Sequence, residues 1–212
     1  MIMAEKYIYF VRHGETVGNV EQFSQDMLTE LTDRGHQQAL TVAERCAALP
    51  IEVVITSDMK RAIDTGAPIA KAAGLTPSTA GLFREWMTPK SVRGKKYEDP
   101  AYQDYLAELK EHFEDPDWRY EDAENFNDLK ERSLAAAAYL EEQAAKHVLV
   151  VTHGKFLRYF TTLLLHNKEA SPAVLATMMN AMILTNTGIT VFRVEKGKWT
   201  LVTWNDHQHF AE

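Results

Sequence analysis

Two short apolar runs in this chain end in a histidine followed by a glycine. Residues 7–11 lead to Arg12-His13-Gly14, and residues 148–152 lead to His153-Gly154. Short runs rich in β-branched and aromatic residues predict buried strands. Ligands of open α/β sheets bind just beyond the carboxyl ends of such strands. We therefore expect both imidazoles at one edge of one sheet.

The residue types at these strand ends indicate an anion, most simply a phosphate. Arg12 presents a guanidinium, which binds phosphate oxygens in a fork. The neutral imidazole of the adjacent His13 can attack phosphorus. Either histidine alone fits a structural role, and it is the repetition of the pattern that favours a site.

Two polar residues that follow the first strand are candidates for the rim of this site. Residues 17–26 are polar and aperiodic, which predicts a loop. Asn19 in this loop could donate to a bound oxyanion, or could simply form a turn. Ser24 is a weaker candidate for the same rim.

Arg61 follows a predicted strand over residues 51–56 and falls in the first turn of a predicted helix. A helix N-terminus disfavours a cation, and a bound dianion would correct the mismatch. The alternative is an ordinary surface ion pair with Asp58 or Asp64.

Glu85 lies between Arg84 and Trp86 in the sequence. A carboxyl group shielded by an aromatic ring holds its proton more readily and can act as a general acid. The alternative is that Glu85 pairs with Arg84.

Residues 91–125 differ from the rest of the chain in being dense in acidic and aromatic residues. Tyr102, Tyr105, Leu106, Leu109 and Phe113 recur at helical spacing. We interpret this segment, called the insertion below, as a helical lid beside the sheet. Its basic residues could contact substrate or balance neighbouring acids, and they are Arg93, Lys95 and Lys96.

The remaining pattern alternates helices with strands. Helices are predicted from the N-cap Thr32 to Leu49, with Ala39, Leu40, Ala43 and Ala47 on the apolar side, and over residues 126–146 and 155–166. Arg132, in the second of these helices, faces outward or supports the pocket from behind. Residues 189–194 and 199–204 predict a hairpin, whose edge could pair with a second subunit as a homodimer. His207 and His209 belong to a terminal tail rather than a metal site.

Bulk composition limits the classes of function. The 212 residues suit one α/β domain, and a net charge of -7 argues against nucleic-acid or acidic-membrane partners. The single cysteine, Cys46, allows no intrachain disulfide and fits a reducing compartment. Without a signal peptide or an apolar run long enough to cross a bilayer, we expect a cytoplasmic protein.

Five blocks of sequence, in order, resemble the histidine phosphatase superfamily, also called phosphoglycerate-mutase-like, and its phosphatase branch. They are Arg12-His13-Gly14-Glu15-Thr16 with Asn19, Leu31-Thr32 with Gly35 and Gln38-Ala39, Ser57 with Arg61-Ala62 and Thr65, Glu85, and Thr152-His153-Gly154. The resemblance implies a three-layer α/β/α sandwich with a mostly parallel mixed sheet, formed as a single domain over residues 1–212.

The resemblance also implies roles for the site residues. His13 would be the nucleophile that becomes phosphohistidine, and Arg12, Arg61 and His153 would bind the phosphoryl oxygens with help from Asn19 and the amide of Gly154. Glu85 would protonate the leaving oxygen and then activate water. No metal or cofactor is needed, because two guanidinium groups and a second imidazole neutralise the charge.

The expected activity is a phosphomonoesterase acting on a small phosphate ester, with inorganic phosphate as product. A mutase of this family carries a Glu-Arg-His-Tyr-Gly-type segment where this chain reads Glu85-Trp86-Met87, and the acidic insertion is a poor cradle for a bisphosphate. Mutase-type transfer and a protein-phosphohistidine phosphatase are the alternatives. A non-catalytic phosphate-binding module should have lost a histidine or an arginine of this set.

Overall fold

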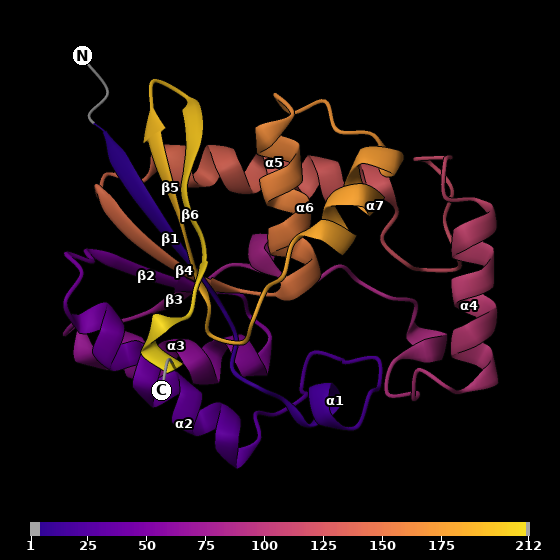
Figure 1. Ribbon diagram of the computed structural model, residues 1–212, viewed down its shortest axis with the longest axis horizontal. Helices are drawn as coiled ribbons and strands as arrows, with labels where there is room; N and C mark the ends of the chain where they lie inside the picture. The colour runs from indigo at the N-terminus through magenta and orange to yellow at the C-terminus, as the bar shows by residue number, and fades with distance from the viewer. Residues whose placement is uncertain (1–4, 211–212) are drawn as a thin grey trace.

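The computed structural model describes residues 5–210, whose strands form one mixed sheet in the order β3-β2-β4-β1-β5-β6 (Figure 1). The strands are β1 (Lys6–Arg12), β2 (Val53–Thr56), β3 (Ser78–Thr79), β4 (His147–Thr152), β5 (Ile189–Glu195) and β6 (Lys198–Asp206). The first four are parallel to one another, whereas β5 and β6 run antiparallel to their neighbours. The mostly parallel mixed sheet and its terminal hairpin are confirmed.

Helices cover both faces of this sheet. α2 (Asp33–Ala47) and α3 (Lys60–Ala72) pack on one face, and α5 (Phe126–Glu142), α6 (Gly154–Leu165) and α7 (Pro172–Ala181) pack on the other (Figure 1). Side chains alternate along a strand, so Ile8 and Phe10 join the second layer while Tyr9 and Val11 join the first. The three-layer sandwich is confirmed.

The register of the two central strands places the histidines. β1 and β4 are adjacent and parallel, and Arg12 lies opposite Thr152. The N–H of His13 then donates to the carbonyl of Thr152 at 3.0 Å. His13 and His153 therefore leave the sheet side by side.

Helix α2 begins as predicted, with the Thr32 side chain accepting a hydrogen bond from the Gly35 N–H. It ends at Ala47, two residues before the predicted end. The assignment of Leu40 and Ala47 to the apolar side was wrong, since both are exposed. Cys46 is buried instead, and burial raises the pKa of its thiol to about 12.

The insertion packs mainly on itself. It begins within the short helix η2 (Lys90–Val92) and contains the predicted helix, α4 (Pro100–Glu111), which stands apart from the sheet at the right of Figure 1. Val92, Tyr102 and Tyr105 form a separate small core. Leu106, one of the residues that recur at helical spacing, is 37% exposed.

Three further short helices complete the described chain. They are α1 (Val17–Val20), within the segment predicted as a loop, η1 (Gly81–Phe83) and η3 (Gln208–Phe210), within the predicted tail. Across residues 5–210, every helix falls short of the length and apolarity that crossing a bilayer would take.

Candidate active site

The imidazoles of His13 and His153 lie together at the carboxyl ends of β1 and β4. Their ring centroids are 5.2 Å apart, and the two residues are 3% and 0% exposed. Two strand ends that are separated by some 140 residues of sequence thus deliver one pair of buried imidazoles, as the repeated pattern predicted.

The hydrogen bond of His13 fixes which of its nitrogens can react. Nδ1 lies 2.7 Å from the carbonyl oxygen of Gly14. A carbonyl only accepts, so Nδ1 carries the proton and Nε2 keeps its lone pair. The neutral ring therefore offers a nucleophilic nitrogen.

His153 is arranged in the opposite sense. Its Nε2 lies 2.8 Å from the hydroxyl oxygen of Ser57, which already accepts from the Met59 N–H at 3.3 Å. The Ser57 hydroxyl can thus donate to Nε2, and in that tautomer the proton of His153 lies on Nδ1. That buried Nδ1 has no partner within the described chain.

Two guanidinium groups flank the histidines. Each guanidinium group is held by a hydrogen bond to a backbone carbonyl. Arg12 donates to the Leu184 carbonyl at 2.6 Å, and Arg61 donates to the Asp26 carbonyl at 2.8 Å. In both residues the buried Nε has no partner among residues 5–210. Unpaired buried donors are costly, so three of them in one place indicate a site for an anion.

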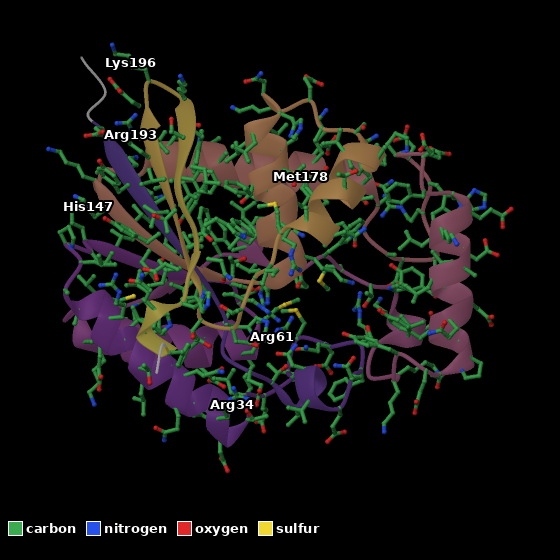
Figure 2. All side chains as sticks on the ribbon, in the orientation of Figure 1. Arg34, Arg61, His147, Met178, Arg193 and Lys196 are labelled. Carbon is green, nitrogen blue, oxygen red and sulfur yellow. The ribbon has the colours of Figure 1, made fainter. Side chains whose placement is uncertain are left out.

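The ion pairs considered for Arg61 do not form. Asp58 binds Arg84, and Asp64 binds Lys60. Arg61 itself is 2% exposed and points into the middle of the molecule, whereas Arg34 and Arg193 extend from its periphery (Figure 2). Burial lowers the pKa of Arg61 to about 10.

Burial and positive charge also keep both imidazoles neutral. The pKa of His13 lies well below its usual value, first because of burial and then because of Arg61 and Arg12. The pKa of His153 is lowered in the same way, by burial and then by Arg61. Neutrality suits His13 as a nucleophile and leaves the site's positive charge to the arginines.

Glu85 faces the same pocket but does not pair with Arg84, the partner considered in the sequence analysis. Arg84 is taken by Asp58, and Glu85 instead accepts from the N–H groups of Lys155 and Phe156 at 3.1 and 2.8 Å. These groups belong to the first turn of α6, where a carboxylate is favoured. The bond fixes Glu85 beside Gly154, whose own N–H makes no hydrogen bond within residues 5–210.

Arg132 supports this arrangement from behind, one of its two expected positions. It donates to the carbonyls of Leu82 and Arg84, at 2.9 and 2.8 Å, and forms a two-bond ion pair with Glu124. α5 thereby holds the backbone that leads into Glu85.

Asn19 and Ser24 both line the pocket, as predicted for its rim. The side-chain Oδ1 of Asn19 accepts a hydrogen bond from the Thr16 N–H at 3.1 Å, which caps α1. The Ser24 hydroxyl meets that of Thr88 at 3.1 Å. Both residues therefore also serve the turn-forming or structural roles that competed with a binding role.

Several residues of the pocket were not singled out from sequence. The cavity measures about 190 Å³ and is lined by Arg12, His13, Asn19, Ser24, Gln25, Met59, Arg61, Glu85, Trp86, Met87, Thr88, Arg93, Tyr97, Tyr102, Gly154, Lys155 and Arg158. Asn186, outside this set, donates to the His13 carbonyl at 2.9 Å. Lys155 and Arg158 could have been found, because their spacing puts them on the face of α6 that follows His153.

Close backbone contact explains the glycines around His13. A Cβ on Gly14 would lie 2.6 Å from the Gly35 carbonyl oxygen, and one on Gly35 would lie 2.0 Å from that of Glu15. The N–H of Gly14 donates to Thr65 at 3.0 Å. The start of α2 and the side chain of Thr65 thus clamp the turn after His13.

Within residues 5–210, no three His, Cys, Asp or Glu side chains are grouped so as to hold a metal ion. His207 and His209 bond to protein instead, His207 through Nδ1 to the Asn205 carbonyl at 2.9 Å.

Comparison with known proteins shows the family of this chain. Residues 8–207 match the model of the histidine phosphatase superfamily (branch 1). The chain is 31% identical to phosphoglycerate mutase-like protein 4 of Arabidopsis thaliana, covering 97% of this chain and 87% of that one. It is 30% identical to the metal-independent phosphoserine phosphatase of the same plant, covering 96% and 83%.

Solved structures share the fold. YhfR of Bacillus stearothermophilus superimposes with a TM-score of 0.81 at 24% identity, covering 96% of this chain and 98% of that one. The chain belongs to the histidine phosphatase superfamily.

Proposed function

We propose that this protein is a metal-independent phosphomonoesterase that works through a phosphohistidine on His13. The observation that carries the proposal is the set of three unpaired buried donors beside the lone pair of His13 Nε2: Arg12 Nε, Arg61 Nε and His153 Nδ1. A phosphoryl group placed there would meet a nucleophile and the charge that its oxygens require.

The reaction has two displacements at one nitrogen. In the first, Nε2 of His13 forms a bond to phosphorus while the ester P–O bond breaks, and Glu85 gives a proton to the leaving oxygen. In the second, Glu85 takes a proton from water, the water oxygen bonds to phosphorus, and the P–N bond breaks. Inorganic phosphate leaves, and His13 and Glu85 return to their starting states.

The experiment is phosphate release from phenyl phosphate by the purified protein, without added metal or bisphosphoglycerate. We expect turnover, together with an acid-labile, base-stable phosphoprotein on rapid quenching. His13→Ala should lose both, by on the order of 10⁴-fold or more in rate. Hydrolysis that survives in His13→Ala would contradict the mechanism.

Mutase-type transfer is the second candidate. The acidic composition of the insertion was the argument against binding a bisphosphate, and the lining of the pocket removes that argument. The acidic residues of the insertion do not line the pocket, and the insertion contributes Arg93, Tyr97 and Tyr102 there instead. If phosphate release from phenyl phosphate is slow but phosphoglycerate isomerises when bisphosphoglycerate is added, transfer to a second substrate is the activity.

A further inference from the structure

The charge that lines the pocket exceeds what one phosphoryl group needs. Five cationic side chains and one carboxylate line it. A phosphate dianion would offset Arg12 and Arg61. The remaining cations are Arg93, Lys155 and Arg158, and the Glu85 carboxylate is already bonded to the first turn of α6. This excess lies in a protein whose net charge is -7.

Two of the three extra cations are arginines that backbone carbonyls hold through one edge of the guanidinium group. Arg93 donates through Nε and Nη2 to the Thr88 carbonyl, at 2.9 and 2.6 Å. Arg158 donates through Nε to the Met182 carbonyl at 2.7 Å. Neither forms an ion pair with a carboxylate of residues 5–210. An anchored guanidinium loses little freedom when it binds a carboxylate or phosphate.

The extra cations lie close to the phosphoryl end of the pocket. Lys155 and Arg158 are three residues apart in the first turns of α6, directly after Gly154. Arg158 lies near enough to Arg12 to help lower the pKa of that guanidinium, after the larger effect of burial. The Glu85 carboxylate acts in the opposite direction and raises the pKa of both Arg12 and Arg158. One carboxylate does not balance two guanidinium groups, so positive charge remains for a further anion.

Part of the wall of this cavity is aromatic. The rings of Tyr97 and Tyr102 contact each other in a tilted arrangement, with centroids 4.9 Å apart, and line the same cavity as Arg93. Backbone hydrogen bonds tie this wall to the loop after β1, from Tyr97 N–H to the Gln22 carbonyl at 2.8 Å and from Gly94 N–H to the Ser24 carbonyl at 2.7 Å. The backbone beside Arg93 is therefore held in place relative to the loop that follows β1.

We propose that Arg93, Lys155 and Arg158 form a second anion subsite, and that the substrate is a phosphate ester with a further carboxylate or phosphate a few atoms from its phosphoryl group. This inference rests on the proposed phosphoryl chemistry at His13 and adds the class of ester. It also assigns a specificity role to Arg93, which the insertion supplies.

The test compares matched substrates that differ only in the second group. They are 2-, 3- and 4-carboxyphenyl phosphate, the carbamoylphenyl phosphates of the same geometry, and the corresponding phenylene bisphosphates. We expect kcat/KM for at least one acid or bisphosphate to exceed that of its neutral amide by about tenfold or more, because charge-assisted hydrogen bonds replace neutral ones. Whichever anion is preferred identifies the natural second group.

Variants then assign the preference to residues. In the Arg93→Gln, Arg158→Gln double variant, the acid-to-amide ratio should fall to about threefold or less, and the double lysine variant should restore part of it. Because both values of the acid-to-amide ratio are measured on the same variant, a general loss of activity lowers both values equally and leaves the ratio unchanged. Lys110→Gln, which removes an exposed charge of α4 outside the pocket, should keep the wild-type ratio.

The outcomes separate the two proposals. If every phenyl phosphate is left intact, the proposed function fails. If phenyl phosphate is hydrolysed but acids and bisphosphates are not preferred, or if the preference survives in the double glutamine variant, the second subsite is wrong.

Discussion

The two sides of the pocket are built by different means. On the sheet side, Arg12, His13 and His153 leave adjacent strands, are largely buried, and are bound to backbone carbonyls or to Ser57. On the insertion side, Arg93 and Tyr97 lie in irregular backbone and are only half-buried. The sheet side thus holds the groups of the proposed reaction in place through the central strands, whereas the insertion side is held by backbone hydrogen bonds between residues 94–97 and 22–24.

The sheet side has a cost that the insertion side lacks. Arg61 and both imidazoles are buried, and the unpaired Nε and Nδ1 atoms are isolated from water. Such groups are retained for what they bind rather than for stability. This difference leads to opposite expectations for substitutions on the two sides.

Arg61→Gln should give the largest effect. Losing a donor to the phosphoryl oxygens should lower kcat/KM for phenyl phosphate by about 10²- to 10³-fold. Because a buried charge without a carboxylate partner is removed, the free energy of unfolding in urea should stay level or rise. Arg193→Gln, at a peripheral residue of β5 paired with Glu5, is the control and should change neither quantity measurably. A loss of stability with activity intact would mean that Arg61 serves the fold rather than the site, which contradicts this prediction.

Gly35→Ala should break the sheet side without touching the pocket. The new Cβ would meet the Glu15 carbonyl oxygen at 2.0 Å, so the turn after His13 has to move. We expect a loss of about 1–3 kcal/mol in urea unfolding and a fall in kcat.

Gly74→Ala is the matched control for that substitution. Gly74 has a φ of +69° but open space around its Cβ. The variant should lose about 1–2 kcal/mol and keep its kcat. Equal activities of the two variants would show that the clamp on the His13 turn is unnecessary.

The sheet side was predictable because its signals are local. An apolar run predicts a strand, a strand end predicts where His13 and His153 lie, and Thr32 marks the start of α2. The partners of Arg61 were not predictable, since Asp58 and Asp64 are equally near in sequence. Only the fold shows that Arg84 and Lys60 occupy them.

The sequence signal of the insertion side is too weak to predict which of its residues line the pocket. Its composition is acidic, which led to the expectation of a poor cradle for charged substrates. The fold turns Arg93 and Tyr97 toward the pocket, because the backbone of residues 94–97 pairs with residues 22–24. Composition averages over a segment, whereas a pocket uses only the residues that face it.

The pH dependence of the free energy of unfolding should reveal the cost of burying the two imidazoles on the sheet side. The pKa values of His13 and His153 are well below 6.5 in the folded protein. As the pH falls below 6.5, the two imidazoles bind protons in the unfolded chain but remain unprotonated in the folded protein. The free energy of unfolding should therefore fall by about 1.4 kcal/mol per pH unit for each histidine, down to the folded pKa. Urea unfolding between pH 7 and 5, in phosphate-free buffer, measures this slope.

His13→Asn serves as the control for that slope. It removes one of the two imidazoles and should make the pH dependence shallower. A slope that is unchanged in His13→Asn would mean that His13 already takes up a proton in the folded state, and the case for a neutral nucleophile would be lost.

Ser24→Ala should give the smallest effect, and it tests whether the pocket rim after β1, which supports the insertion side, takes part in chemistry. It deletes the hydroxyl pair with Thr88 but keeps the backbone bond from the Ser24 N–H to the Lys95 carbonyl at 2.9 Å. We expect a loss of about 0.5–1.5 kcal/mol in stability and a rise of a few-fold in KM at constant kcat. Ser91→Ala removes an exposed bond to Glu121 elsewhere in the insertion and should leave KM unchanged. A tenfold or larger fall in kcat for Ser24→Ala alone would mean that the rim positions the reacting atoms, since a group that only orders the wall alters binding and leaves the chemical step as it was.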